Sequence, residues 1–153
     1  MQEESFEDID TDFNISNGKT DHIKVLFSID WDYYFTIKGE LPTRNEEINA
    51  SKEHWGAEQK LKKGALEQAG WSDIKRLPKL KAIQLGAIFY RKDRNYDPDN
   101  ITSAHKYILD ALQEYDILEN DGWKQVKSPF ILGWKRDKHN PRTEIFLKEV
   151  DSE

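Results

Sequence analysis

The chain has 153 residues, of which 37% are hydrophobic and 34% charged, enough to bury one hydrophobic core. No apolar run approaches the roughly 18 residues of a membrane-spanning helix, and the first residues lack the features of a secretory signal, so we expect a cytoplasmic protein with no membrane partner. The absence of cysteine excludes disulfides, thiolate metal sites and a cysteine nucleophile.

The net charge of -6 comes from one end of the sequence. Residues 1–18 hold six acidic residues and no Lys or Arg, whereas the remainder has 23 acidic and 23 basic residues. Basic residues outnumber acidic ones by eight to four in residues 52–81 and by seven to two in residues 124–148. These two basic zones keep nucleic acid among the possible partners, because phosphate binding depends on local positive charge.

The expected elements begin after a tail. Residues 1–20 lack periodic apolar residues, so we interpret them as a flexible acidic tail preceding a single domain over residues 21–153. Alternating apolar residues from Ile23 to Trp31 predict a half-buried strand, which residues 33–37 extend or return from.

The next two elements are a helix and a strand. Thr43 and Glu46 have the spacing of a capping box and predict a helix over about 44–69, which Gly70 ends. Residues 80–91 read as a strand with apolar residues on both faces, which is typical of a central position in a sheet.

The last elements complete an α/β (α+β) pattern. Apolar residues at helical spacing predict a second helix over about 98–116, and Asp121-Gly122 predicts a turn. Residues 123–134 and 143–150 read as two closing strands. The expected fold is a single domain of order β-α-β-α-β-β, with a mixed sheet packed against helices.

Two carboxylates stand where the 80–91 strand leads into the second helix. Asp97 and Asp99 are two residues apart and can converge on a hard divalent cation such as Mg²⁺, which prefers oxygen ligands. On the helix, Lys106 and Asp110 point the same general way as this pair, and the turn at Asp121 can return a third carboxylate.

A purely structural interpretation stays open for the same residues. Asp97 before Pro98 is a good helix N-cap, Asp99 suits the helix dipole, and Asp121-Gly122 is a common turn. The four histidines are scattered, which disfavours a zinc site. Tryptophans 55, 71, 123 and 134 are interpreted as core or dimer-interface residues rather than as DNA contacts.

The region 91–124 resembles the RusA family of Holliday-junction resolvases, especially the members that phages and prophages encode. The resemblance rests on five elements in order: Asp97-Pro98-Asp99-Asn100, Lys106, Asp110-Ala111-Leu112, Asn120-Asp121, and Gly122-Trp123-Lys124. It implies a homodimeric Mg²⁺-dependent endonuclease that cuts four-way DNA junctions symmetrically, with Mn²⁺ as a substitute metal and no organic cofactor. It implies that Asp97, Asp99 and Asp121 bind one or two metal ions, that Lys106 is an active-site lysine, and that Asn100 lies near DNA.

The strand end before the acid pair is basic. Arg91, Lys92 and Arg94 are the best candidates for sequence-independent contacts with DNA phosphates beside the metal. Two alternatives remain: a nuclease that prefers flaps or forks, and a non-catalytic nucleic-acid-binding module in which the acids serve only as cap and turn. The nuclease hypothesis predicts that Asp97, Asp99 and Asp121 converge, with a basic rim.

Overall fold

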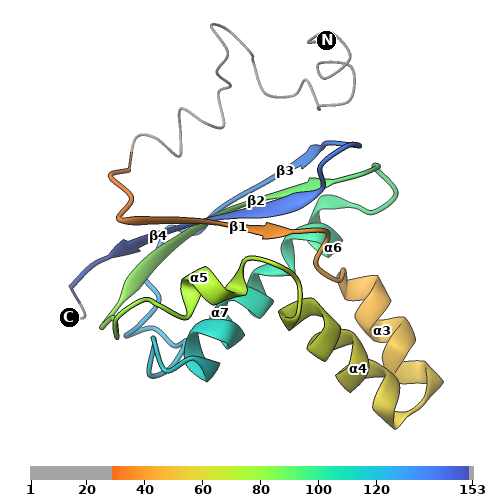
Figure 1. Ribbon diagram of the computed structural model, residues 1–153, viewed down its shortest axis with the longest axis horizontal. Coiled ribbons are helices and arrows are strands. Elements are labelled where there is room, and N and C mark those ends of the chain that lie inside the picture. The colour runs from red at the N-terminus through yellow and green to blue at the C-terminus, as the bar shows by residue number, and fades with distance from the viewer. Residues whose placement is uncertain (1–28, 152–153) are drawn as a thin grey trace, which may run out of the picture.

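Residues 29–151 are described by the computed structural model (Figure 1). In this range four strands form one mixed sheet in the order β1-β4-β2-β3. They are β1 (Tyr33–Lys38), β2 (Ile83–Arg91), β3 (Ile131–Arg136) and β4 (Arg142–Glu149). β4 pairs antiparallel with β1 and β2, and β3 pairs parallel with β2. The predicted α+β class, a mixed sheet packed with helices, is therefore confirmed.

Helices cover one face of this sheet (Figure 1). They are α3 (Arg44–Glu53), α4 (Trp55–Leu66), α5 (Trp71–Ile74), α6 (Pro98–Thr102) and α7 (His105–Glu114). The core lies between the two layers: alternate residues Ile83, Leu85, Ala87 and Phe89 of β2 meet Ile108 and Leu112 of α7, and all six are 3% exposed or less. As predicted, β2 occupies an interior position in the sheet, because strands flank it on both sides.

The strand predicted from Ile23 to Trp31 can be compared with the structure at residues 29–31 only, and there the prediction is wrong. Residues 29–31 are not in a strand, and β1 begins at Tyr33. The acidic tail 1–20 and residues 21–28 lie outside the described residues. The first of the two closing strands also starts later than expected, since residues 123–130 precede the strand β3.

Each of the two long predicted helices is divided in two. The capping box of Thr43 and Glu46 is present, but the backbone at His54 is extended, with φ -168° and ψ 165°, and separates α3 from α4. The second helix breaks after Thr102, where the Thr102 and Ser103 hydroxyls donate to the carbonyl oxygens of Pro98 and Asn100 at 2.9 and 2.8 Å. Such side-chain bonds to the preceding turn compete with the helical ladder.

Gly70 shows why the chain turns as it does after α4. Its φ is +118°, and a Cβ atom there would lie 2.2 Å from the carbonyl oxygen of Thr36. Only glycine fits this approach, which lets Trp71 become 2% exposed and donate from Nε1 to the Ala65 carbonyl at 2.9 Å. The short helix α5 that follows was not expected from the sequence.

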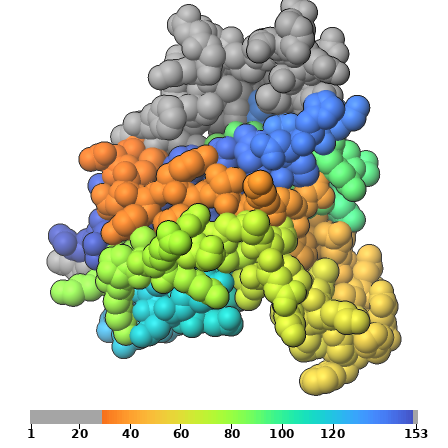
Figure 2. Space-filling model, viewed as in Figure 1, coloured from red at the N-terminus to blue at the C-terminus, as the bar shows by residue number. Residues whose placement is uncertain are grey.

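Helices α3 and α4 form a lobe that stands out from the rest of the molecule (Figure 2). No residue of α3 is buried, and Trp55 at the start of α4 is 85% exposed. Among the described residues, no helix has both the length and the apolar character needed to cross a membrane.

Candidate functional site

The cavity of most interest lies at the carboxyl ends of the parallel strands β2 and β3. Its volume is about 230 Å³. The lining residues are Arg91, Asp93, Arg94, Tyr96, Asp97, Pro98, Ile101, Trp134, Lys135 and Arg136. β2 and β3 run parallel, and α6 and α7 lie between them along the chain. The loop after β2 and the end of β3 therefore meet at one edge of the sheet. The carboxyl ends of parallel strands are where α/β proteins commonly bind ligands. We call this cavity the arginine recess.

Asp97 borders the arginine recess and is exposed. It occupies the N-cap position of α6, with φ -71° and ψ 156°, but its side chain makes no capping hydrogen bond. The structural interpretation of Asp97 as a helix cap therefore holds for its backbone only. Its carboxylate is not committed to the helix and can serve another purpose.

Asp99 and Asn100 follow on the first turn of α6. Asp99 is exposed and does not line the recess, and Asn100 is partly exposed. Asp97 and Asp99 therefore stand on either side of Pro98 at the start of α6, and only Asp97 borders the recess. Asp93, on the loop before them, lines the recess with Asp97, and its Oδ1 accepts from the Asn95 N–H at 3.1 Å.

Asp121 lies at the other end of β2. The segment that follows it is tied to the first residue of the strand: the Ile83 N–H donates to the Gln125 carbonyl at 2.8 Å, and Ile83 pairs with Val126. The nine residues of β2 rise about 3.3 Å each, so the two strand ends lie about 26 Å apart. The expected convergence of Asp121 with Asp97 and Asp99 does not occur within one chain.

Lys106 is also outside the recess. Its side chain is 69% exposed, and its Nζ lies 3.5 Å from Asp110 Oδ1 in an i,i+4 pair on α7. The shared face of Lys106 and Asp110 is as predicted. The break after Thr102 interrupts the helical spacing that was counted from Asp99, because α6 and α7 are separate helices.

The three predicted phosphate contacts have different environments. Arg91 is 6% exposed, with Nη1 donating to the Leu41 carbonyl at 3.0 Å and Nη2 lying 3.3 Å from Glu40 Oε1. Lys92 and Arg94 are exposed, and Arg94 lines the recess while Lys92 does not. Arg91 therefore has a structural role, whereas the sequence predicted only a contact with phosphate. Of the three residues, Arg94 is the best placed to contact a ligand.

Two residues of the recess were not expected beside the acid pair. Arg136 ends β3 beside Arg91, and Trp134, which is 37% exposed, lies beside Phe89. Their proximity to Asp97 depends on the parallel pairing of β2 with β3, which no local pattern reveals. Of the tryptophans interpreted as core or dimer-interface residues, Trp71 is in the core, whereas Trp55 and Trp123 are 85% and 96% exposed in the single chain and stay predicted dimer-interface residues.

The residues at the recess fit a metal site of two carboxylates better than one of three. Within residues 29–151, no three histidine or acidic side chains gather in a way that could hold a metal ion. Mg²⁺ is often held by only one or two carboxylates, with water and substrate phosphate supplying the other ligands. Asp97 at the edge of the recess and Asp99, two residues on and outside its lining, are the candidate pair that the sequence predicts.

Comparison with known proteins adds no identification: the chain matches no model of a protein family and no curated protein.

Proposed function

We propose that this protein is a cytoplasmic, Mg²⁺-dependent endodeoxyribonuclease that cuts branched DNA, with four-way junctions as its substrate. The observation that carries the proposal is an uncapped Asp97 carboxylate beside a cavity lined by three arginines, within the segment that resembles the junction resolvases. A carboxylate pair for a hard cation next to guanidinium groups for phosphate is one combination that can catalyse phosphodiester hydrolysis.

The residues of the chain have separate tasks in this proposal. Asp97 and Asp99 would hold the ion, which when bound supplies an activated water and neutralises charge on the phosphate. Arg94 and Lys92, both exposed on the loop before the acids, would neutralise neighbouring phosphates and orient the backbone. Asn100, one residue after Asp99, would contact the same DNA strand.

A homodimer provides two such sites, because symmetric cuts in two strands call for two equivalent centres related by a two-fold axis. It also gives Asp121 a place in the reaction. Since Asp121 lies at the far end of β2 from Asp97 in its own chain, it can join an Asp97–Asp99 pair only from the second copy. Lys106, whose Nζ lies 3.5 Å from Asp110 Oδ1 on α7 and which does not line the recess, would place a positive charge near the scissile phosphate.

The experiment compares substrates of different branching. Labelled four-way junction, flap and linear duplex are incubated with the protein in Mg²⁺, in Mn²⁺ or in EDTA. The proposal expects paired symmetric nicks in the junction with either metal and none in EDTA. Equal cutting of flaps would replace the junction by a broader class of substrates, and cutting in EDTA would contradict the metal site.

A non-catalytic binding module is the second candidate. It is favoured by the lack of three clustered acids within residues 29–151. This candidate expects junction binding that is insensitive to Mg²⁺ and no cleavage of any of the three DNAs, so the same experiment separates the two functions.

A further inference from the structure

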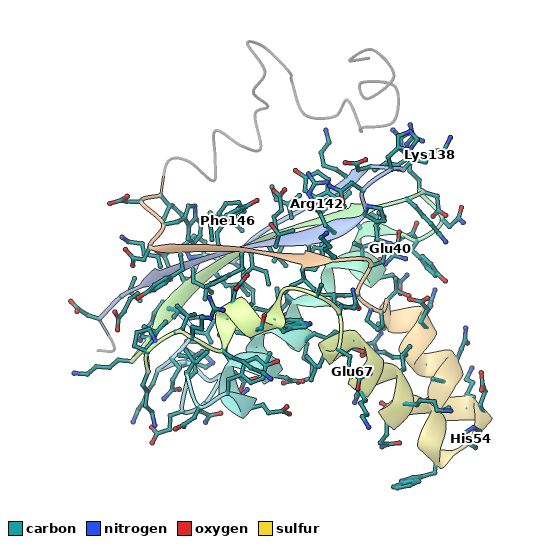
Figure 3. The ribbon with its side chains drawn as sticks, viewed as in Figure 1. Glu40, His54, Glu67, Lys138, Arg142 and Phe146 are labelled. Carbon is teal, nitrogen blue, oxygen red and sulfur yellow. The ribbon has the colours of Figure 1, made fainter. Side chains whose placement is uncertain are left out.

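The sheet has a second apolar face, on the side away from the helices, which we call the outer face. Phe146 and Arg142 of β4 point to this side (Figure 3). The pairing register places Ile88 and Tyr90 of β2 there with them, because paired residues share a face and alternate residues follow on it. Ile88, Tyr90 and Phe146 form the smaller hydrophobic cluster and are 2%, 7% and 8% exposed. They are buried although the described helices cover the opposite face (Figure 1).

Two glycines stand beside Ile88 on the outer face. Gly86 precedes it by two residues on β2, and Gly133 is its partner on β3. Glycine has no side chain, and the other strand partner of Ile88 is the acidic Glu144. The strand neighbours therefore provide little apolar cover at this point, yet both glycines are buried. Glycine inside a strand often marks a place where another segment approaches the sheet closely.

The two ends of the cluster are covered by side chains of the described residues. At one end, the rings of Trp31 and Tyr34 lie 5.8 and 5.0 Å from the ring of Phe146, measured between centres. At the other end, the Arg142 guanidinium lies 3.8 Å from the ring centre of Tyr90. These contacts leave the middle of the cluster, around Ile88 and the two glycines, to be covered by another segment.

The described part of the chain begins beside the outer face. Lys148 Nζ donates to the Asp30 carbonyl at 3.0 Å, and the Glu149 N–H donates to Asp32 Oδ2 at 2.7 Å. Together with the packing of Trp31 on Phe146, these bonds hold residues 30–32 against β4. The residues that come before them in the sequence thus start next to the cluster.

The preceding sequence carries side chains that suit such a cover. Ile23, Val25 and Phe27 are apolar and alternate along the chain, so that an extended segment would present them on one side. Phe27 is four residues before Trp31, and four extended residues span at most about 14 Å. Neighbouring strands lie only about 4.8 Å apart, so this segment can reach the strands beside Phe146.

We propose that the outer face is the docking surface of the chain's own segment 23–28, whose alternating apolar residues pack over Ile88 and the two glycines. The occupant is the same chain rather than a second copy, because Ile88 is 2% exposed in the single chain. The inference is independent of the proposed function, since it needs neither metal nor DNA. It also means that the homodimer proposed above would have to use another surface, because the outer face is occupied.

The test uses thiol labelling of the full chain, which has no cysteine of its own. Ile131→Cys places a probe on the outer face, where Ile131 packs against the cluster. Ala87→Cys places a control on the opposite face of β2, where Ala87 is 0% exposed. The rate of reaction with a maleimide is measured for each variant, without and with urea. We expect both thiols to react far more slowly in the folded protein than in urea.

Substitutions in the segment assign the protection to it. Phe27→Asp should speed the labelling of Ile131→Cys at least about tenfold, because a carboxylate opposes burial where a phenyl ring favours it. Leu26→Asp, at the neighbouring position on the other side of the alternation, is the matched control and should change the rate less than about twofold. Ala87→Cys should stay protected in both backgrounds. If it does not, the milder pair Phe27→Ser and Leu26→Ser replaces the aspartates.

Three results would overturn the docking: rapid labelling of Ile131→Cys in the otherwise unchanged chain, equal acceleration by the changes at Phe27 and Leu26, or protection that is lost on dilution. The last result would assign the outer face to a second copy. If Ile131→Cys fails to fold, Thr36→Cys on the same face of β1 replaces it. Because the assay contains neither DNA nor metal, its failure leaves the proposed nuclease standing, and a protein that cuts no DNA leaves the docking standing.

Discussion

Individual residues near Asp97 show which roles can be read from sequence. The pair Asp97 and Asp99 is recognisable by its spacing before a helix, and the resemblance to a resolvase family draws attention to it. The roles of Arg91 and Arg136 are not recognisable, because both depend on contacts with remote segments: Glu40 for Arg91, and the end of β2 for Arg136. A run of basic residues at the end of a strand has the same sequence pattern whether its side chains are buried or exposed.

The buried position of Arg91 leads to a prediction about stability. Replacing Arg91 with Leu should lower the free energy of unfolding by about 3 kcal/mol, because it leaves the Glu40 carboxylate and the Leu41 carbonyl without their partner. Urea denaturation followed by circular dichroism measures the change. Lys92→Gln, at the exposed neighbouring position, should change the same quantity by less than about 0.5 kcal/mol. Equal stability of the two variants would refute the structural role of Arg91.

At the scale of elements, the sequence predicts strand β2 and the cap of α3 well but misses where helices break. Apolar alternation and the Thr43–Glu46 box are local signals, so their outcome does not depend on the rest of the fold. The break at His54 has no proline to announce it, and the apolar stripe continues across it. The break after Thr102 has a signal in the adjacent Thr102 and Ser103, whose hydroxyls bond to the preceding turn.

Two glycines on neighbouring elements give a matched test of the connection between α4 and α5. Gly70→Ala should destabilise the protein by more than about 2 kcal/mol, because a Cβ there would meet the Thr36 carbonyl at a φ of +118°. Gly64→Ala, inside α4 with no atom within 4 Å of its added Cβ, should instead stabilise it by about 0.5–1 kcal/mol. Thermal denaturation of both variants checks this, and a shift of the same sign in both would contradict the described turn.

For the whole molecule, the separation of Asp121 from Asp97 and Asp99 decides what the proposed site requires. No sequence pattern could reveal this separation, because it results from α7 running back along the sheet between Asp99 and Asp121. The order of motifs along the chain is the same whether they meet within one copy or across two. Only the pairing of Ile83 with Val126 shows that they do not meet in one copy.

A mixing experiment tests the inter-subunit site. In the proposed homodimer, coexpressed Asp99→Asn and Asp121→Asn chains would form mixed dimers in which one site carries both substitutions and the other carries none. The junction should then be nicked at about a quarter of the wild-type rate, although each variant alone is inactive. A mixture of Asp97→Asn with Asp99→Asn has no intact site and should stay inactive. No recovery in the first mixture would show that Asp121 does not act from the second copy.

We propose that the Asp97 carboxylate holds the metal ion for phosphodiester cleavage, and replacing this carboxylate checks that role. Binding and cleavage of the same labelled four-way junction in Mg²⁺ are compared for the wild type, Asp97→Asn and the surface control Asp73→Asn, whose carboxylate lies on α5 beside Arg76. Asp97→Asn should bind the junction as the wild type does and cut it at least about 100-fold more slowly, while Asp73→Asn should do both normally. Cleavage by Asp97→Asn at the wild-type rate would contradict a metal-binding role for Asp97.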